Sequence, residues 1–225
     1  VLRGFFFYFS KEISDLADYM VSAAVEIYMR IATDLLPTPA KSHYVFNLRD
    51  LSKCVQGVLQ ADSGTMREEA AMLRLFYHEC LRVFHDRLIN VEDKSYFYFL
   101  MREICGRNFG TAVLALPDTP IITKPPLLFF GDFMQFGANK EDRIYEEIKN
   151  VEKMKSVLQD YLDDYNLLES KDMHLIFFMD AIEHCVRIAR ILRSERGNAL
   201  LVGVGGMGKQ SLTRLSSHVN AYKYV

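Results

Sequence analysis

The sequence predicts a mostly α-helical chain with a small α/β part towards its C-terminal end, and three observations support this fold class. Apolar residues recur at three- and four-residue steps through most of the 225 residues, as in helices that bury one side. A short apolar run, Ala199–Val202, has the length and composition of a buried parallel strand and leads into a glycine-rich turn. The stretch Pro117–Pro126 carries four prolines in ten residues, so it cannot continue a helix. We therefore expect two parts joined by an extended connector.

Four helical patterns precede the connector. The first ends at Pro37-Thr38-Pro39, because the residue before a proline is forced out of the helical region. The second begins with an aromatic, extended segment and becomes helical near Asn47. In the fourth, an aromatic stripe at helical spacing indicates core packing. The patterns cover Phe5–Leu36, His43–Asp62, Met66–Leu88 and Lys94–Phe109.

The second part starts with a short apolar segment, Leu127–Phe130, which is predicted to be buried and to end in a turn at Gly131-Asp132. Two amphipathic helices are predicted next, over Tyr145–Asn166 and Asp172–Arg193. A last helix, after the glycine-rich turn, is expected to pack its leucines against the predicted strand. Three arginines along one ridge indicate an exposed surface or, alternatively, an acidic partner; they are Arg187, Arg190 and Arg193.

The glycine-rich turn carries the most specific chemistry. Gly203–Lys209 fits the G-x-x-x-x-G-K pattern of a phosphate-binding loop, between a predicted strand and a predicted helix. Its four glycines let the backbone adopt positive φ and approach a bulky anion. Successive backbone N–H groups and the N-terminus of the next helix attract negative charge, and Lys209 adds an ammonium group for phosphates. A glycine-rich turn that binds nothing is the alternative, but the matching strand, spacing, lysine and helix favour nucleotide binding.

The position after the lysine departs from the usual pattern. A serine or threonine whose hydroxyl binds Mg²⁺ is typical there, whereas this chain has Gln210 followed by Ser211. The amide oxygen of Gln210 and the hydroxyl of Ser211 are both candidates for the contact with Mg²⁺. The sequence leaves the choice between them open.

Arg49 occupies an unusual place in the second helical pattern. It is predicted to lie in the first turn of a helix, where a cation is unfavourable against the helix dipole. Two explanations are open at this point. One is a surface ion pair with Asp50 or Asp18, and the other is contact with an anion that lies nearby.

Several classes of function are disfavoured. A net charge of −2 gives no basic field for nucleic acid. The pair His78-Glu79 suggests a zinc-protease motif, but Arg82 stands where the second histidine of H-E-x-x-H is needed. Four dispersed cysteines without a C-x-x-C pair indicate reduced, mostly buried thiols of an intracellular protein. No stretch approaches the length of a membrane span.

Two long stretches resemble axonemal dynein heavy chains, a family of motor proteins built from AAA+ ATPase modules. His43–Gln60, HYVFNLRDLSKCVQGVLQ, together with Tyr77–Leu88, YHECLRVFHDRL, resembles the helical lid domain of one module. Leu175–Leu215 is similar to the start of the next module, and its G-V-G-G-x-G-K-Q-S sequence is similar to the form found in the fourth module of the motor ring. The resemblance covers nearly the whole chain.

This resemblance implies a domain organisation. The chain, which begins without methionine, is expected to be a piece of a longer heavy chain. It would comprise the last helices of the core of the third AAA+ module, the helical lid of that module, a connector, and the N-terminal part of the fourth module. That last part would hold the first strand and the phosphate-binding loop of a P-loop NTPase core. The expected bounds are 1–36, 37–116, 117–132 and 133–225.

The resemblance also implies site residues. The loop would hold the phosphates of ATP or ADP, with Mg²⁺ near Gln210 or Ser211, and the glutamine is the family's own form. Met207 departs from the family, which more often has serine there. Arg49 matches the lid arginine that reaches the phosphates of the preceding nucleotide site. No catalytic residue is expected within this chain, because hydrolysis also needs an acidic pair on a strand and an arginine from a neighbour. The implied nucleotide contacts in the loop are Gly203, Val204, Gly205, Gly206, Met207, Gly208, Lys209, Gln210 and Ser211.

The implied function is that of one part of the ATP-binding motor ring of an axonemal dynein heavy chain, an ATP hydrolase that moves towards microtubule minus ends and drives ciliary and flagellar beating. This part would carry a regulatory nucleotide. Its partners would be the neighbouring AAA+ modules, and through the parent protein microtubules and other dynein chains, without nucleic acid or membrane. The expected location is the cytoplasm, in the cytoskeleton of the axoneme. Two alternatives are a non-motor AAA+ remodelling ATPase and a structural module whose loop binds nothing.

Overall fold

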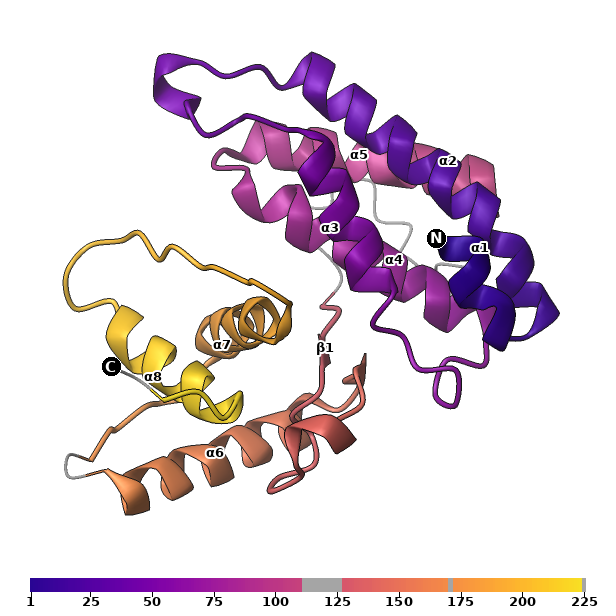
Figure 1. Cartoon of the computed structure of the whole chain (residues 1–225). Coiled ribbons are helices and arrows are strands. Elements are labelled where there is room, and N and C mark those ends of the chain that lie inside the picture. The colour runs from indigo at the N-terminus through magenta and orange to yellow at the C-terminus, as the bar shows by residue number, and fades with distance from the viewer. Residues whose placement is uncertain (111–126, 170–171, 224–225) are drawn as a thin grey trace. The chain divides into compact units, whose positions relative to one another are not determined.

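A computed structural model describes residues 1–110, 127–169 and 172–223 of the chain. The chain divides into two compact units, Val1–Leu128 and Phe129–Val225, and each is described here by itself (Figure 1). The predicted connector Pro117–Pro126 lies outside the described residues. The mostly helical fold class is confirmed, because helices dominate both units and the only sheet in the described part of the chain is a pair of two-residue strands.

The first unit is a bundle of four long helices. Helix α2 packs along α5, and α3 packs along α4, as Figure 1 shows. The four predicted patterns correspond to these helices, although the structure trims their ends. The helices are α2 (Lys11–Asp34), α3 (Leu48–Val58), α4 (Glu69–Val83) and α5 (Val91–Phe109), with the shorter α1 (Leu2–Phe5), η1 (Phe6–Tyr8), η2 (Pro39–Lys41) and η3 (His85–Arg87) around them.

Polar side chains cap the starts of α2, α3 and α5, whereas α4 has no side-chain cap. The predicted start near Asn47 is confirmed, since Asn47 is the N-cap of α3 and its side chain accepts a hydrogen bond from the Arg49 amide at 2.9 Å. Ser10 caps α2 and Asn90 caps α5 in the same way. Such caps satisfy backbone donors that have no partner within the helix. The helices therefore start at polar residues that sequence inspection can find.

The cysteines of the first unit lie in its core as free thiols, which confirms the prediction. The sulfur atoms of Cys54 and Cys80 are 3.3 Å apart between α3 and α4. Burial raises the pKa of the Cys105 thiol to about 12, and it raises that of Cys80 as well. These thiols are therefore neutral at physiological pH and act as small apolar groups in the packing.

The second unit combines three helices with a small antiparallel sheet. Strand β1 (Phe130–Gly131) pairs with β2 (Glu146–Glu147), with Phe130 opposite Glu147. Phe129 and Phe130 are buried, so the second half of the predicted apolar segment Leu127–Phe130 is confirmed, and the strand ends at Gly131. Leu127 is 45% exposed, so the prediction of burial is wrong for the start of the segment. The helices are α6 (Val151–Leu168), α7 (Met179–Arg193) and α8 (Lys209–Val219), with the short η4 (Lys140–Asp142) between the strands.

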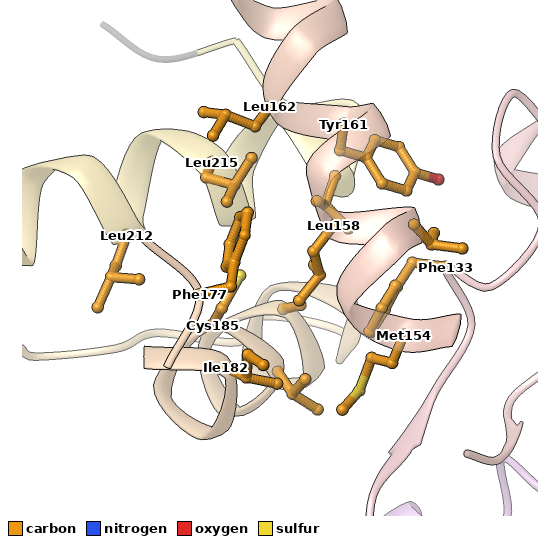
Figure 2. Close-up of a cluster of buried hydrophobic side chains, with 14 of the residues drawn as sticks. Phe133, Met154, Leu158, Tyr161, Leu162, Phe177, Ile182, Cys185, Leu212 and Leu215 are labelled. Carbon is orange, nitrogen blue, oxygen red and sulfur yellow. The ribbon is translucent and has the colours of Figure 1, made fainter. Parts of the chain in front are cut away.

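The core of this unit lies where the three helices meet (Figure 2). Each helix contributes apolar side chains at helical spacing, and Phe177 enters from the extended segment before α7. Burial raises the pKa of the Cys185 thiol to about 11, which keeps it neutral beneath α8. The labelled side chains are Phe133, Met154, Leu158, Tyr161, Leu162, Phe177, Ile182, Cys185, Leu212 and Leu215.

Helix α6 begins six residues later than the pattern over Tyr145–Asn166 predicted. The residues before it form strand β2, and the Ile148 amide donates to the Phe129 carbonyl at 2.8 Å. Asn150 then caps the helix by accepting from the Lys153 amide at 2.9 Å. Cross-strand bonds to a segment far away in the sequence thus replace the predicted first turns.

Helix α7 also begins later than predicted, at Met179 rather than Asp172. The amide side chain of Asn166, on α6, both accepts from the Met173 N–H at 2.8 Å and donates to its carbonyl at 3.1 Å. This pair of bonds holds the segment extended. Its side chains consequently alternate, with Met173 and Phe177 buried and Ile176 exposed.

The structure does not form the predicted strand Ala199–Val202. This segment pairs with no other part of the described chain, and Leu200 and Val202 are 89% and 87% exposed. A strand is stabilised by hydrogen bonds to a neighbour, so an apolar run alone does not form one. Helix α8 accordingly packs on α7 and α6, which corrects the expectation that it would pack on a strand. None of the helices in the described ranges is long and apolar enough to span a bilayer.

Candidate functional site

The glycine-rich loop turns the extended segment into helix α8, and two of its glycines are required by backbone geometry. Gly206 has φ of 81° and Gly208 has φ of 75°, both in the left-handed region. Gly208 is also the N-cap of α8. A side chain at either position would strain the backbone by about 1–2 kcal/mol. The loop conformation therefore requires glycine at positions 206 and 208.

The start of α8 has the character of an anion site. No side chain caps it, and its first turn contains no acidic residue. The unpaired amides of that turn and the helix dipole make this end electropositive. Lys209, the first helical residue, folds back into the loop, and its Nζ donates to the carbonyls of Gly203 at 2.8 Å and Val204 at 2.6 Å. Amides and an ammonium group are thus gathered within one turn of chain.

The two candidate Mg²⁺ contacts lie on the next residues of the helix. Gln210 is exposed and Ser211 is half-buried. Neither side chain makes a hydrogen bond within the described part of the chain, so both oxygen atoms are available to a ligand. In the described ranges, no group of three or more histidine, cysteine or acidic side chains could hold a metal.

Several contacts that the sequence did not reveal anchor α8 to the unit. The Ser216 hydroxyl donates to the Cys185 carbonyl at 3.3 Å, and Arg143 Nη1 donates to the Val219 carbonyl at 2.5 Å. His218 Nε2 lies 2.8 Å from Asp164 Oδ2 on α6. These partners are separated by dozens of residues, so no local pattern signals them. They hold the helix whose first turn carries the loop.

The arginine ridge of α7 has acidic partners within the same unit. Arg193 Nε lies 2.9 Å from Asp132 Oδ2, and its guanidinium group stacks 5.1 Å from the centre of the Tyr145 ring. Arg187 pairs with Glu183 at 3.1 Å. These two arginines therefore pair with carboxylates of their own unit, and an acidic partner outside the unit stays a prediction.

Arg49 lies at the start of α3, in the first unit, and its guanidinium group has no partner in the described part of the chain. The predicted ion pair with Asp50 or Asp18 is wrong. Asp50 accepts instead from the Asn47 amide and from Arg87, each at 3.0 Å, and Asp18 binds Arg3. Arg49 is exposed beside this network, so its guanidinium group is open to solvent.

The network beneath Arg49 makes Asp50 a testable residue. Asp50 completes a capping box with Asn47 and is buried against Arg87. We expect Asp50→Ala to destabilise the start of α3 by about 1–2 kcal/mol, since it removes a cap and the partner of Arg87. Hydrogen exchange of the α3 amides measures this effect. Lys53→Ala, an exposed change on the same helix, is the control, and equal exchange in both variants would contradict the prediction.

Two family models match the chain. The family described as "Dynein heavy chain, ATPase lid domain" matches residues 3–94, which include α2, α3, α4 and Arg49. The family described as "P-loop containing dynein motor region D4" matches residues 173–225, which include α7, the glycine-rich loop and α8. The two matches lie in the two separate units of the structure.

Curated proteins match over nearly the whole chain. Human "Dynein axonemal heavy chain 6" is 59% identical over 223 residues, which is 99% of this chain and 5% of the relative. Mouse "Dynein axonemal heavy chain 1" is 46% identical over 95% of this chain and 5% of the relative. Rat "Dynein axonemal heavy chain 12" is 42% identical over 93% of this chain and 7% of the relative. The chain thus spans about a twentieth of the length of the first two relatives and 7% of the third.

Proposed function

The chain belongs to the dynein heavy-chain family, and on that premise we propose that its glycine-rich loop binds the phosphates of ATP or ADP with Mg²⁺. The observation that carries this proposal is the start of α8, where left-handed glycines, uncapped amides and Lys209 lie together. The side-chain oxygen of Gln210 or that of Ser211 would contact the ion, since neither side chain makes a hydrogen bond within the described part of the chain. The proposed contacts are Gly203, Val204, Gly205, Gly206, Met207, Gly208, Lys209, Gln210 and Ser211.

Arg49 is proposed to contact the phosphates of a different nucleotide, held by the preceding module. Its exposed guanidinium group without a protein partner supports this role, as does the match of residues 3–94 to a dynein lid domain. The proposed domain organisation follows from the same reasoning. Residues 1–36 would end the core of the third AAA+ module, 37–116 would form its lid, 117–132 the connector, and 133–225 the start of the fourth module.

For the whole protein we propose the activity of an axonemal dynein, an ATPase that moves towards microtubule minus ends in cilia and flagella. The names of the relatives support the axonemal assignment. The proposed partners are the neighbouring AAA+ modules, and beyond them microtubules and other dynein chains. The fourth-module nucleotide would regulate the motor rather than be hydrolysed by residues of this chain.

Lys209→Ala tests the nucleotide proposal. Loss of the ammonium group removes charge-assisted hydrogen bonds to phosphate, and we expect affinity to fall by roughly ten- to a hundredfold. The measurement is photolabelling of the intact parent protein with an azido-ATP analogue. The label is mapped to peptides around the loop by mass spectrometry, which separates this site from any other.

Lys223→Ala is the matched control, because Lys223 is an exposed lysine outside the loop. It should label as strongly as the unmodified protein. If Lys209→Ala labels the loop at the same ATP concentrations as the unmodified protein, Lys209 does not hold the phosphates, and the assignment of a phosphate-binding loop is wrong. If the unmodified protein shows no label in the loop peptides, the loop is a structural turn that binds no nucleotide.

A further inference from the structure

Met207 stands out among the ten methionines of the chain, all of which lie in the described ranges. Eight are buried or half-buried, and only Met29 and Met207 are exposed, at 60% and 66%. Met29 lies on α2, in the first unit. Met207 is inside the glycine-rich loop. A solvent-exposed thioether is the form of methionine that oxidants reach most readily.

The thioether of Met207 lies against the part of the loop that holds Lys209. A Cβ atom placed on Gly203 would be 3.4 Å from Met207 Sδ and 3.8 Å from Lys209 Nζ. The sulfur and the ammonium group thus both lie within 4 Å of the same point beside Gly203. Lys209 Nζ donates to the Gly203 and Val204 carbonyls, so the hydrogen bonds that hold its ammonium group are made within this part of the loop.

From this arrangement we propose that Met207 is an oxidation site, and that its sulfoxide weakens nucleotide binding at the loop. This inference rests on the proposed function of the loop. The oxidant is a hydroperoxide: a sulfur lone pair attacks the outer peroxide oxygen, the O–O bond breaks and an S–O bond forms. Sulfur loses two electrons and the peroxide gains them. The proton on the attacked oxygen passes to the departing oxygen, so the products from hydrogen peroxide are the sulfoxide and water.

The consequence follows from the change in polarity. A thioether is a weak acceptor, whereas a sulfoxide oxygen is a strong one. Placed beside Lys209, that oxygen competes with phosphate for the ammonium donors. Because a hydrogen bond from a charged donor is at stake, affinity for ATP should fall by roughly tenfold or more. Methionine sulfoxide reductases reverse the modification, so the effect is a switch rather than damage.

The test uses the intact parent protein, treated with dilute hydrogen peroxide with and without Mg-ATP. Trypsin cuts after Arg196 and Lys209 and releases the loop as GNALLVGVGGMGK, which contains one methionine. A second peptide, residues 12–30, contains exposed Met29 and fully buried Met20 as internal controls. Mass spectrometry should find Met207 and Met29 oxidised and Met20 spared, with ATP protecting Met207 alone.

The second measurement is azido-ATP photolabelling of the loop before and after oxidation. Oxidised protein should need a roughly tenfold higher concentration of the ATP analogue to reach the same labelling. Treatment with methionine sulfoxide reductase should restore the concentration that the untreated protein needs. Met207→Leu removes the sulfur, so peroxide must leave its labelling unaltered, whatever its starting affinity. This variant separates oxidation of Met207 from oxidation elsewhere.

The outcomes distinguish this inference from the proposed function. If the untreated protein labels at the loop but oxidised protein labels equally well, or if Met207 stays reduced while Met29 is oxidised, the oxidation proposal is overturned and nucleotide binding stands. If the untreated protein shows neither labelling nor protection, both proposals are wrong.

Discussion

Replacing Gly57 with alanine is expected to destabilise the helical bundle of the first unit by about 3 kcal/mol, because there is no room for the added methyl group. A Cβ on Gly57 would lie 1.9 Å from Glu79 Oε2 and 2.6 Å from Glu79 Cγ. The clash therefore reaches the stem of the side chain as well as its tip. Glu79 is 0% exposed and cannot swing into solvent.

The displaced carboxylate makes this substitution more costly than ordinary overpacking. Glu79 Oε1 lies 3.0 Å from Nδ1 of His78, which is also buried. Moving Glu79 disturbs a buried polar contact between adjacent residues, and disrupted contacts of this kind are expensive. Helices α3 and α4 should separate locally, since Gly57 lies on one and Glu79 on the other.

Hydrogen exchange of α3 and α4 peptides measures this effect, with amide exchange on the order of a hundredfold faster in Gly57→Ala. Gly4→Ala is the matched control. It makes the same substitution in a helix of the same unit, where no atom lies within 4 Å of the added Cβ. Protection in Gly57→Ala equal to that in the control would show that the core can absorb the methyl group, against the prediction.

The sequence predicted the helical elements of the first unit well, because their determinants are local. Apolar spacing marks the buried sides, Asn47 marks the start of α3, and Pro37-Thr38-Pro39 follows the end of α2. The second unit was predicted less well at its boundaries. The starts of α6 and α7 depend on β-pairing and on the contact between Asn166 and Met173, neither of which has a local signature.

The candidate sites also divide into residues that local sequence reveals and residues whose state depends on distant contacts. The glycines and Lys209 could be found from the sequence, since a phosphate-binding loop is a short contiguous motif. The availability of Arg49 could not, because it depends on Arg87 occupying Asp50 and Arg3 occupying Asp18. The exposure of Ala199–Val202 was also not foreseen. An apolar run predicts a buried strand only if the strands that flank it are present, and none is in the described part of the chain.

Gly197→Ala is expected to damage the connection between α7 and the glycine-rich loop, at a cost of about 3 kcal/mol. A Cβ on Gly197 would lie 1.7 Å from the Ile191 carbonyl oxygen and 3.0 Å from that of Ser194. Both obstacles are backbone atoms at the C-terminal end of α7, so no side chain can rotate to relieve the clash. Either the last turn of α7 unwinds or the turn that follows it is displaced.

Displacement of that turn should alter the approach of the chain to the loop. The Gly197 amide donates to the Ser194 carbonyl at 3.0 Å, a bond that sets the direction of the segment leading to Gly203. We therefore expect faster hydrogen exchange in the last turn of α7, where the Ser194 amide bonds to the Arg190 and Ile191 carbonyls, together with weaker azido-ATP labelling of the loop.

Gly205→Ala supplies the matched control for the exchange measurement. It lies in the same connection, its φ is not in the left-handed region, and no atom lies within 4 Å of the added Cβ. Exchange in α7 should be unchanged by Gly205→Ala and accelerated by Gly197→Ala. If Gly197→Ala leaves both α7 exchange and loop labelling at their original levels, the tight turn after α7 is not what positions the loop. The anchoring of α8 through Ser216 and His218 would then be sufficient by itself.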